Sequence, residues 1–110
     1  MQFVGNQKIY FILMLLGLIL TWSFNLLFIH QTGGFNIGLF LAGVYDNYAS
    51  SSIGNDVIIA YLAFLVWSYG ESKRLNMPFW WLIVIVSTLG AFAFGFPLFL
   101  FLREKYLEKA

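Results

Sequence analysis

Long runs without a charged side chain dominate this sequence. No residue between Lys8 and Asp46 is charged, and none between Arg74 and Arg103. Because an α-helix rises about 1.5 Å per residue, about 20 apolar residues are enough to cross a hydrocarbon core of about 30 Å. The spacing of the charges therefore indicates helices that cross a membrane.

The composition also favours a membrane environment. Charged residues make up 10% of the 110 residues and aromatic residues 21%, whereas a typical soluble domain has about 25% charged residues. A soluble fold of this size could not bury so much apolar surface. We predict an all-α protein of one domain, an integral membrane three-helix bundle with spans at about residues 8–29, 52–72 and 78–102.

The second span is the shortest charge-free run. Fourteen residues lie between Asp56 and Glu71, which is about 21 Å of helix. The helix must therefore begin earlier, near Ser52, and we expect Asp56 about one turn inside its start. This places the carboxylate at or just below the membrane interface.

The segment between the first two spans is apolar but broken by glycines, and it is too short for a further crossing. We expect a short interfacial helix near residues 35–46, with a re-entrant segment as the alternative. Three spans place the two termini on opposite sides of the membrane. Basic residues are equally numerous on the two sides, so they leave the orientation open.

The charged turn between the second and third spans is bordered by tryptophans. Trp67 comes before this turn, and Trp80 and Trp81 follow it just after Pro78. Proline is favoured in the first turn of a helix, and tryptophan is enriched where lipid meets water. These three tryptophans are therefore predicted to be interface anchors.

Small and polar residues recur every four positions on two of the predicted helices. Close backbone approach and a few hydrogen bonds drive helix association in lipid. The predicted packing seam, whose alternative role is to line a substrate path, consists of Gly17, Thr21 and Asn25 on the first helix and Ser87, Ala91 and Gly95 on the third.

One group of polar residues is expected on the side of the long loop. Asp56 begins the second helix there and Arg103 ends the third, so we predict a structural ion pair with Asn25 or His30 as a neighbour. Two alternatives stay open for Asp56: a carboxylate at a helix N-terminus that reaches water, and a proton or substrate site. His30 is either solvated or an axial ligand to a haem or a chlorophyll-type pigment.

The sequence points to no catalytic apparatus. It contains no cysteine and a single histidine, which excludes a thiolate nucleophile and a multi-histidine metal cluster. No pair of carboxylates has the spacing for acid–base catalysis, and a formal net charge of +1 suggests no nucleic acid partner. We therefore assign no catalytic residue and no metal site, and the cofactor is unknown.

Three stretches resemble a known family. "NDVIIAYLAFLVWSYGESKRL", "WW" and "FPLFLFLREK" are similar to a bacterial family, frequent in cyanobacteria, of small three-helix membrane proteins of unknown function. The resemblance extends over roughly residues 8 to 106. It implies the three-helix topology and a bacterial inner membrane or thylakoid location, and it supplies no functional residue.

The leading hypothesis is a non-enzymatic accessory or stabilising subunit of a larger membrane complex. Its partners would be membrane lipids and either further copies or other membrane subunits. The alternatives are a small oligomeric transporter or channel and an enzyme that acts on a lipid or isoprenoid. Both alternatives give Asp56 a functional role.

Overall fold

The computed structural model describes residues 3, 5–34 and 36–109, with side chains described up to residue 107, and the regular structure in this part of the chain is entirely helical. In chain order the elements are α1 (Gln7–Thr32), α2 (Ile37–Val44), α3 (Tyr48–Arg74), α4 (Trp80–Ile85), a π-helical turn η1 (Val86–Gly90) and α5 (Phe92–Lys109).

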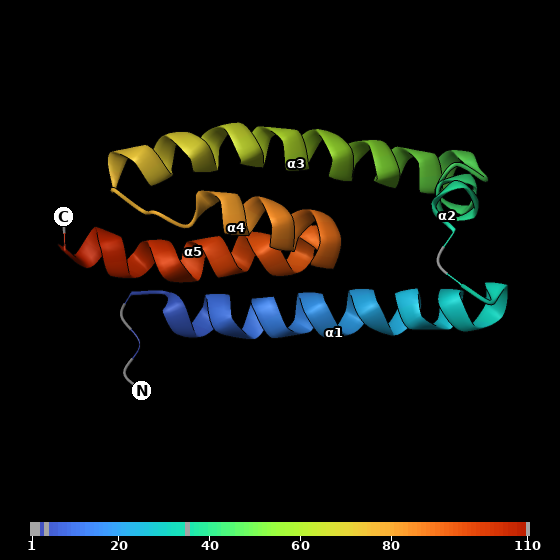
Figure 1. Ribbon diagram of the computed structural model, residues 1–110, viewed down its shortest axis with the longest axis horizontal. Coiled ribbons are helices and arrows are strands. Elements are labelled where there is room, and N and C mark those ends of the chain that lie inside the picture. Colours follow the sequence, from blue (N-terminus) through green and yellow to red (C-terminus); the bar gives the residue numbers. More distant parts are fainter. Residues whose placement is uncertain (1–2, 4, 35, 110) are drawn as a thin grey trace.

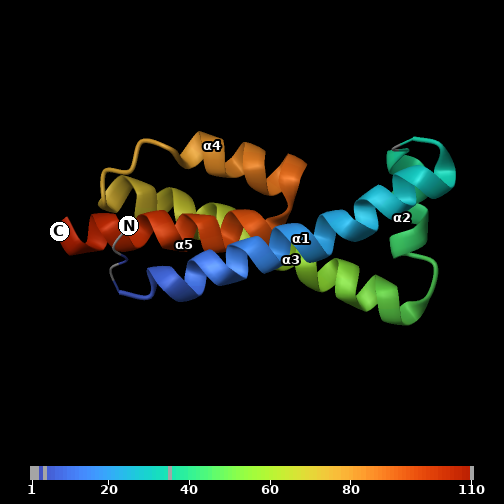
Figure 2. The ribbon, with the colours of Figure 1, turned by 90° about the horizontal axis from the view of Figure 1, so that it is seen from below.

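Two long antiparallel helices, α1 and α3, run the length of the molecule (Figure 1). Helix α2 lies across one end, which we call the α2 end, while both chain termini lie at the other, the terminal end. Helices α4 and α5 form a hairpin in the half nearest the terminal end, with α5 packed against α1 and α4 beside α3 (Figures 1 and 2). Figure 2 shows α1 and α3 crossing in projection.

Helix α3 begins earlier than the sequence predicts. The side chain of Asn47 accepts a hydrogen bond of 2.8 Å from the backbone N–H of Ser50, which caps the helix at Tyr48 rather than near Ser52. Asp56 therefore lies about two turns inside the helix instead of one. The short helix predicted over 35–46 is α2, although residue 35 lies outside the described residues.

The predicted continuous helix over 78–102 is wrong, because the chain reverses at Ala91. The backbone of Ala91 is extended, with φ −170° and ψ 142°, and its N–H closes the π-helical turn on the carbonyl of Val86 at 3.2 Å. The segment α4–η1 leads away from the terminal end and α5 returns to it (Figure 1). The two termini consequently share one end, whereas three crossings would have separated them.

Two of the helices are long and apolar enough to cross a membrane, judged by length and composition. Helix α1 has 26 residues and α3 has 27, which corresponds to about 40 Å each. The hairpin supplies no third helix of this kind among the described residues. The fold is therefore two long helices with a shorter helical hairpin packed against both.

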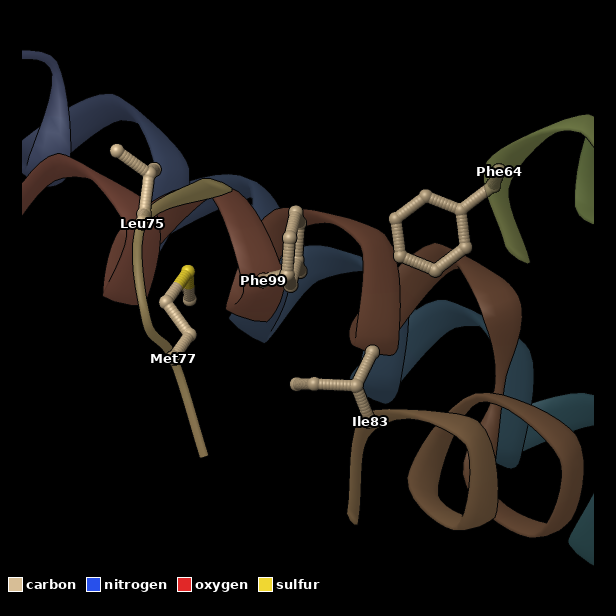
Figure 3. Close-up of a cluster of buried hydrophobic side chains, with 5 residues drawn as sticks. All are labelled: Phe64, Leu75, Met77, Ile83 and Phe99. Atoms are coloured by element: carbon tan, nitrogen blue, oxygen red, sulfur yellow. The ribbon is translucent and has the colours of Figure 1, made fainter. Parts of the chain in front are cut away.

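The hydrophobic core lies in the terminal half of the molecule. Phe99 of α5 is fully buried at its centre, between side chains of α3, α4 and the loop after α3 (Figure 3). The cluster consists of Phe64, Leu75, Met77, Ile83 and Phe99. It fixes the hairpin against α3, while the α2 half has no comparable core among the described residues.

Candidate functional site

The tip of the hairpin is bonded to both long helices. The chain reversal leaves the carbonyl of Gly90 without a helical donor, because the N–H of Phe94 bonds to Ala91 instead. The indole Nε1 of Trp22 on α1 donates to the Gly90 carbonyl at 2.5 Å. On the opposite side, the hydroxyls of Tyr61 in α3 and Thr88 share a hydrogen bond.

The sequence reasoning missed these bonds. Trp22 lies inside an apolar helix, and a buried indole N–H usually finds an acceptor. The indole of Trp22 therefore indicated that a backbone carbonyl without a helical donor lies nearby and accepts its hydrogen bond. Apolar surroundings tolerate such backbone only where its polar groups find partners within the protein.

Helices α1 and α5 make a close backbone contact at Gly17. A β-carbon at this position would collide with the backbone carbonyl of Ala93. Pro97 has no N–H, so it cannot bond this carbonyl as the residue four positions later normally does. Nearer the terminal end, the buried side chain of Gln7 donates from Nε2 to the carbonyl of Phe101 at 2.8 Å.

The third-helix half of the predicted seam has a different role. Ser87, Ala91 and Gly95 are buried, but the hairpin brings Gly95 against Ser87 rather than aligning all three toward α1. On α1, Thr21 and Asn25 are half-buried. Gly17 of that helix makes a close backbone approach to Ala93.

A charged cluster connects the end of α3 to α5 at the terminal end. The Glu71 carboxylate, whose side chain is 12% exposed, accepts hydrogen bonds from Arg74 at 2.7 and 3.0 Å and from Arg103 at 2.6 Å. The guanidinium of Arg103 also lies 5.2 Å from the centre of the Trp67 ring. Charge-assisted hydrogen bonds are about twice as strong as neutral ones, so this cluster holds two elements together.

The predicted ion pair of Asp56 with Arg103 is wrong. The reversal at Ala91 returns α5 to the terminal end, where Arg103 meets Glu71. Asp56 is exposed fifteen positions earlier in α3, toward the α2 end. Asn25 and His30 belong to the α2 half of α1, and no hydrogen bond or ion pair within the described residues joins either one to Asp56.

The three predicted anchors lie toward the terminal end but differ in their surroundings. Trp80 donates from Nε1 to the hydroxyl of Ser68 at 2.9 Å, and its ring lies 4.9 Å from that of Tyr69. The Trp67 ring packs edge-on against Phe99. The Trp81 side chain is exposed. Two of the three are therefore also parts of the packing between helices.

A pocket of about 420 Å³, which we call the terminal pocket, opens between the end of α3 and the start of α4. The Ser72 hydroxyl is buried and has no hydrogen-bond partner within the described residues. The Lys73 ammonium lies 5.0 Å from the centre of the Tyr69 ring. The lining residues are Tyr69, Ser72, Lys73, Asn76, Met77, Pro78, Trp80 and Trp81.

The terminal pocket could not be derived from the sequence pattern. It depends on the turn after α3, where Asn76 adopts a left-handed backbone conformation with φ 58°. Asparagine tolerates this region better than most residues. The observation that could have suggested it is the position of Asn76 just past the end of the helix.

These features describe a small all-α protein with two helices of membrane-crossing length and an aromatic, basic terminal end. The chain belongs to the family described as protein of unknown function DUF2834, which matches residues 9–105. This confirms that the chain belongs to a family of unknown function. No curated protein sequence and no solved structure matches the chain.

Proposed function

We propose that this chain is a small, non-enzymatic integral membrane protein that serves as an accessory or stabilising subunit of a larger membrane complex. The observation that carries the proposal is the apolar surface of the α2 half. Phe24 of α1 is 71% exposed, and Ile53 and Ile59 of α3 are each 66% exposed. A monomeric soluble protein rarely exposes so much contiguous apolar surface.

The separation of the long helices supports a protein partner there. Beyond the hairpin tip, α1 and α3 run on toward α2 without a helix of this chain between them (Figure 1). Small folds commonly gain stability by oligomerisation or assembly when their own core is limited. A helix of a neighbouring subunit would extend the packing that α5 supplies in the terminal half.

The proposed arrangement has α1 and α3 crossing the membrane and the hairpin entering and leaving at the terminal face. The charged cluster around Glu71 and the anchors Trp80 and Trp81 then lie at one interface, as aromatic and basic residues do. The α2 helix lies at the other interface, consistent with its position across the helix ends.

Cysteine labelling tests this topology, and the chain contains no natural cysteine to interfere. Asn6→Cys and Lys105→Cys should react with a membrane-impermeant maleimide from the same face of sealed vesicles. Asp46→Cys should react only from the opposite face. Labelling of positions 6 and 105 from opposite faces would contradict this topology and support three membrane crossings.

Photo-cross-linking tests the assembly. Benzoylphenylalanine replaces Ile59, which faces outward in the α2 half, or Val66, a control that is 77% exposed on the terminal half of the same helix. We expect illumination of native membranes to give one discrete protein adduct at position 59 and only lipid adducts at position 66. Lipid adducts alone at both positions would contradict a subunit role, and an adduct with a second copy would favour the oligomeric transporter or channel.

A further inference from the structure

An apolar groove lies next to the terminal pocket. The groove, of about 340 Å³, is lined by Leu65, Val66, Tyr69 and Trp80. Tyr69 and Trp80 line both spaces, so the groove lies next to the pocket, with these two rings at the boundary. The pocket lies at the end of α3, and the groove extends along α3 and α4 toward the middle of the molecule.

The pocket has the charge and the polar groups for an anion. Both carboxylate oxygens of Glu71 are bonded by Arg74 and Arg103, and no ion pair among the described residues includes Lys73. The positive charge of Lys73 therefore stays available at the pocket. Ser72 is also a lining residue of the pocket, and its hydroxyl is buried without a hydrogen-bond partner within the described residues.

We propose that the terminal pocket and its groove bind one phospholipid with an anionic headgroup. The phosphate lies against Lys73 and Ser72, and one acyl chain follows the groove past Leu65 and Val66. This inference rests on the proposed membrane location, which supplies such lipids. The order of the contacts supports it, because the cationic and hydroxyl groups lie at the helix end and the apolar groove lies further in.

The aromatic residues suit the boundary between headgroup and chain. The indole N–H of Trp80 donates a hydrogen bond to the Ser68 hydroxyl, and this bond fixes the ring where it lines both the pocket and the groove. Trp81 is 61% exposed at the pocket rim. Amphipathic rings of this kind lie at the depth of the glycerol region in membrane proteins.

Tryptophan fluorescence of the full chain in dodecyl maltoside micelles tests the site, because two of its four tryptophans line the pocket. Short-chain phosphatidylglycerol should bind saturably and about tenfold more tightly than short-chain phosphatidylcholine. Lys73→Gln should remove about tenfold of the affinity for phosphatidylglycerol. Lys105→Gln removes the same charge from an exposed position on α5 and should leave the affinity unchanged.

Two further variants separate the polar and apolar parts of the site. Ser72→Ala should weaken binding several-fold through loss of the hydroxyl contact. Val66→Phe should weaken binding by filling the groove without changing any charge or adding a tryptophan to the fluorescence signal. Circular dichroism verifies that each variant keeps the helical content of the parent protein.

Three results would overturn the proposed site. These are equal losses for Lys73→Gln and Lys105→Gln, equal affinity for the two lipids, and competition by glycerol phosphate at the concentration at which the lipid binds. The last result would identify a soluble phosphate compound as the ligand. Alkaline carbonate extraction separates the two proposals. If the chain stays with the membrane yet shows no lipid preference, only the proposed lipid site is wrong. If carbonate releases the chain, the proposed membrane location is wrong.

Discussion

Gly17→Leu should destabilise the fold by at least about 3 kcal/mol, because overpacking against rigid backbone leaves little room to relax. The first carbon of any side chain at this position would collide with the Ala93 carbonyl, a backbone group held in α5. Helix α1 must then move away from α5, and the bonds from Trp22 to Gly90 and from Gln7 to Phe101 would lengthen or break. The free energy of unfolding, measured by titrating dodecyl maltoside micelles with sodium dodecyl sulfate, reports the loss.

Gly70→Leu is the matched control. Gly70 is also a helical glycine, in α3, and a β-carbon there would meet no neighbouring atom within 4 Å. Leucine also has a better helix propensity than glycine, so stability should stay the same or rise slightly. Equal losses for the two substitutions would show that α1 and α5 do not meet at Gly17.

Arg103→Gln should lower stability by about 2 kcal/mol, because it removes a charged donor from a carboxylate that is largely shielded from water. The Arg103 side chain is 23% exposed and connects α5 to the end of α3 through Glu71. Arg74→Gln should have a smaller effect, since Arg74 is 56% exposed and bonds to a residue on its own helix.

A double-mutant cycle between Arg103→Gln and Glu71→Gln checks whether the loss of stability comes from the bond between Arg103 and Glu71. The two losses should be non-additive, with a coupling of about 1 kcal/mol or more. Asp56→Asn serves as the comparison, because the exposed Asp56 has no contact with Arg103, and its combination with Arg103→Gln should be additive. Additive losses in the Glu71 cycle, or coupling in the Asp56 cycle, would contradict the structure.

The part of the candidate site that the sequence located is the set of tryptophans around the charged turn. Trp67, Trp80 and Trp81 lie near the end of α3 and the start of α4. The particular contacts could not be derived. The pairing of Arg103 with Glu71 depends on the direction in which α5 runs, and the terminal pocket depends on the left-handed turn at Asn76.

The sequence by itself determined the helical class and the approximate positions of the two long helices, because a charge-free run sets a length. The start of α3 at the Asn47 cap came from the structure. Only the tertiary structure decided that the last apolar run turns back at Ala91. Hydropathy is a property of each residue, so it has the same value whether the chain crosses the membrane or reverses direction within it. The reversal depends on contacts between distant segments, Trp22 with Gly90 and Gly17 with Ala93, which satisfy the freed carbonyl and allow close packing of α1 on α5.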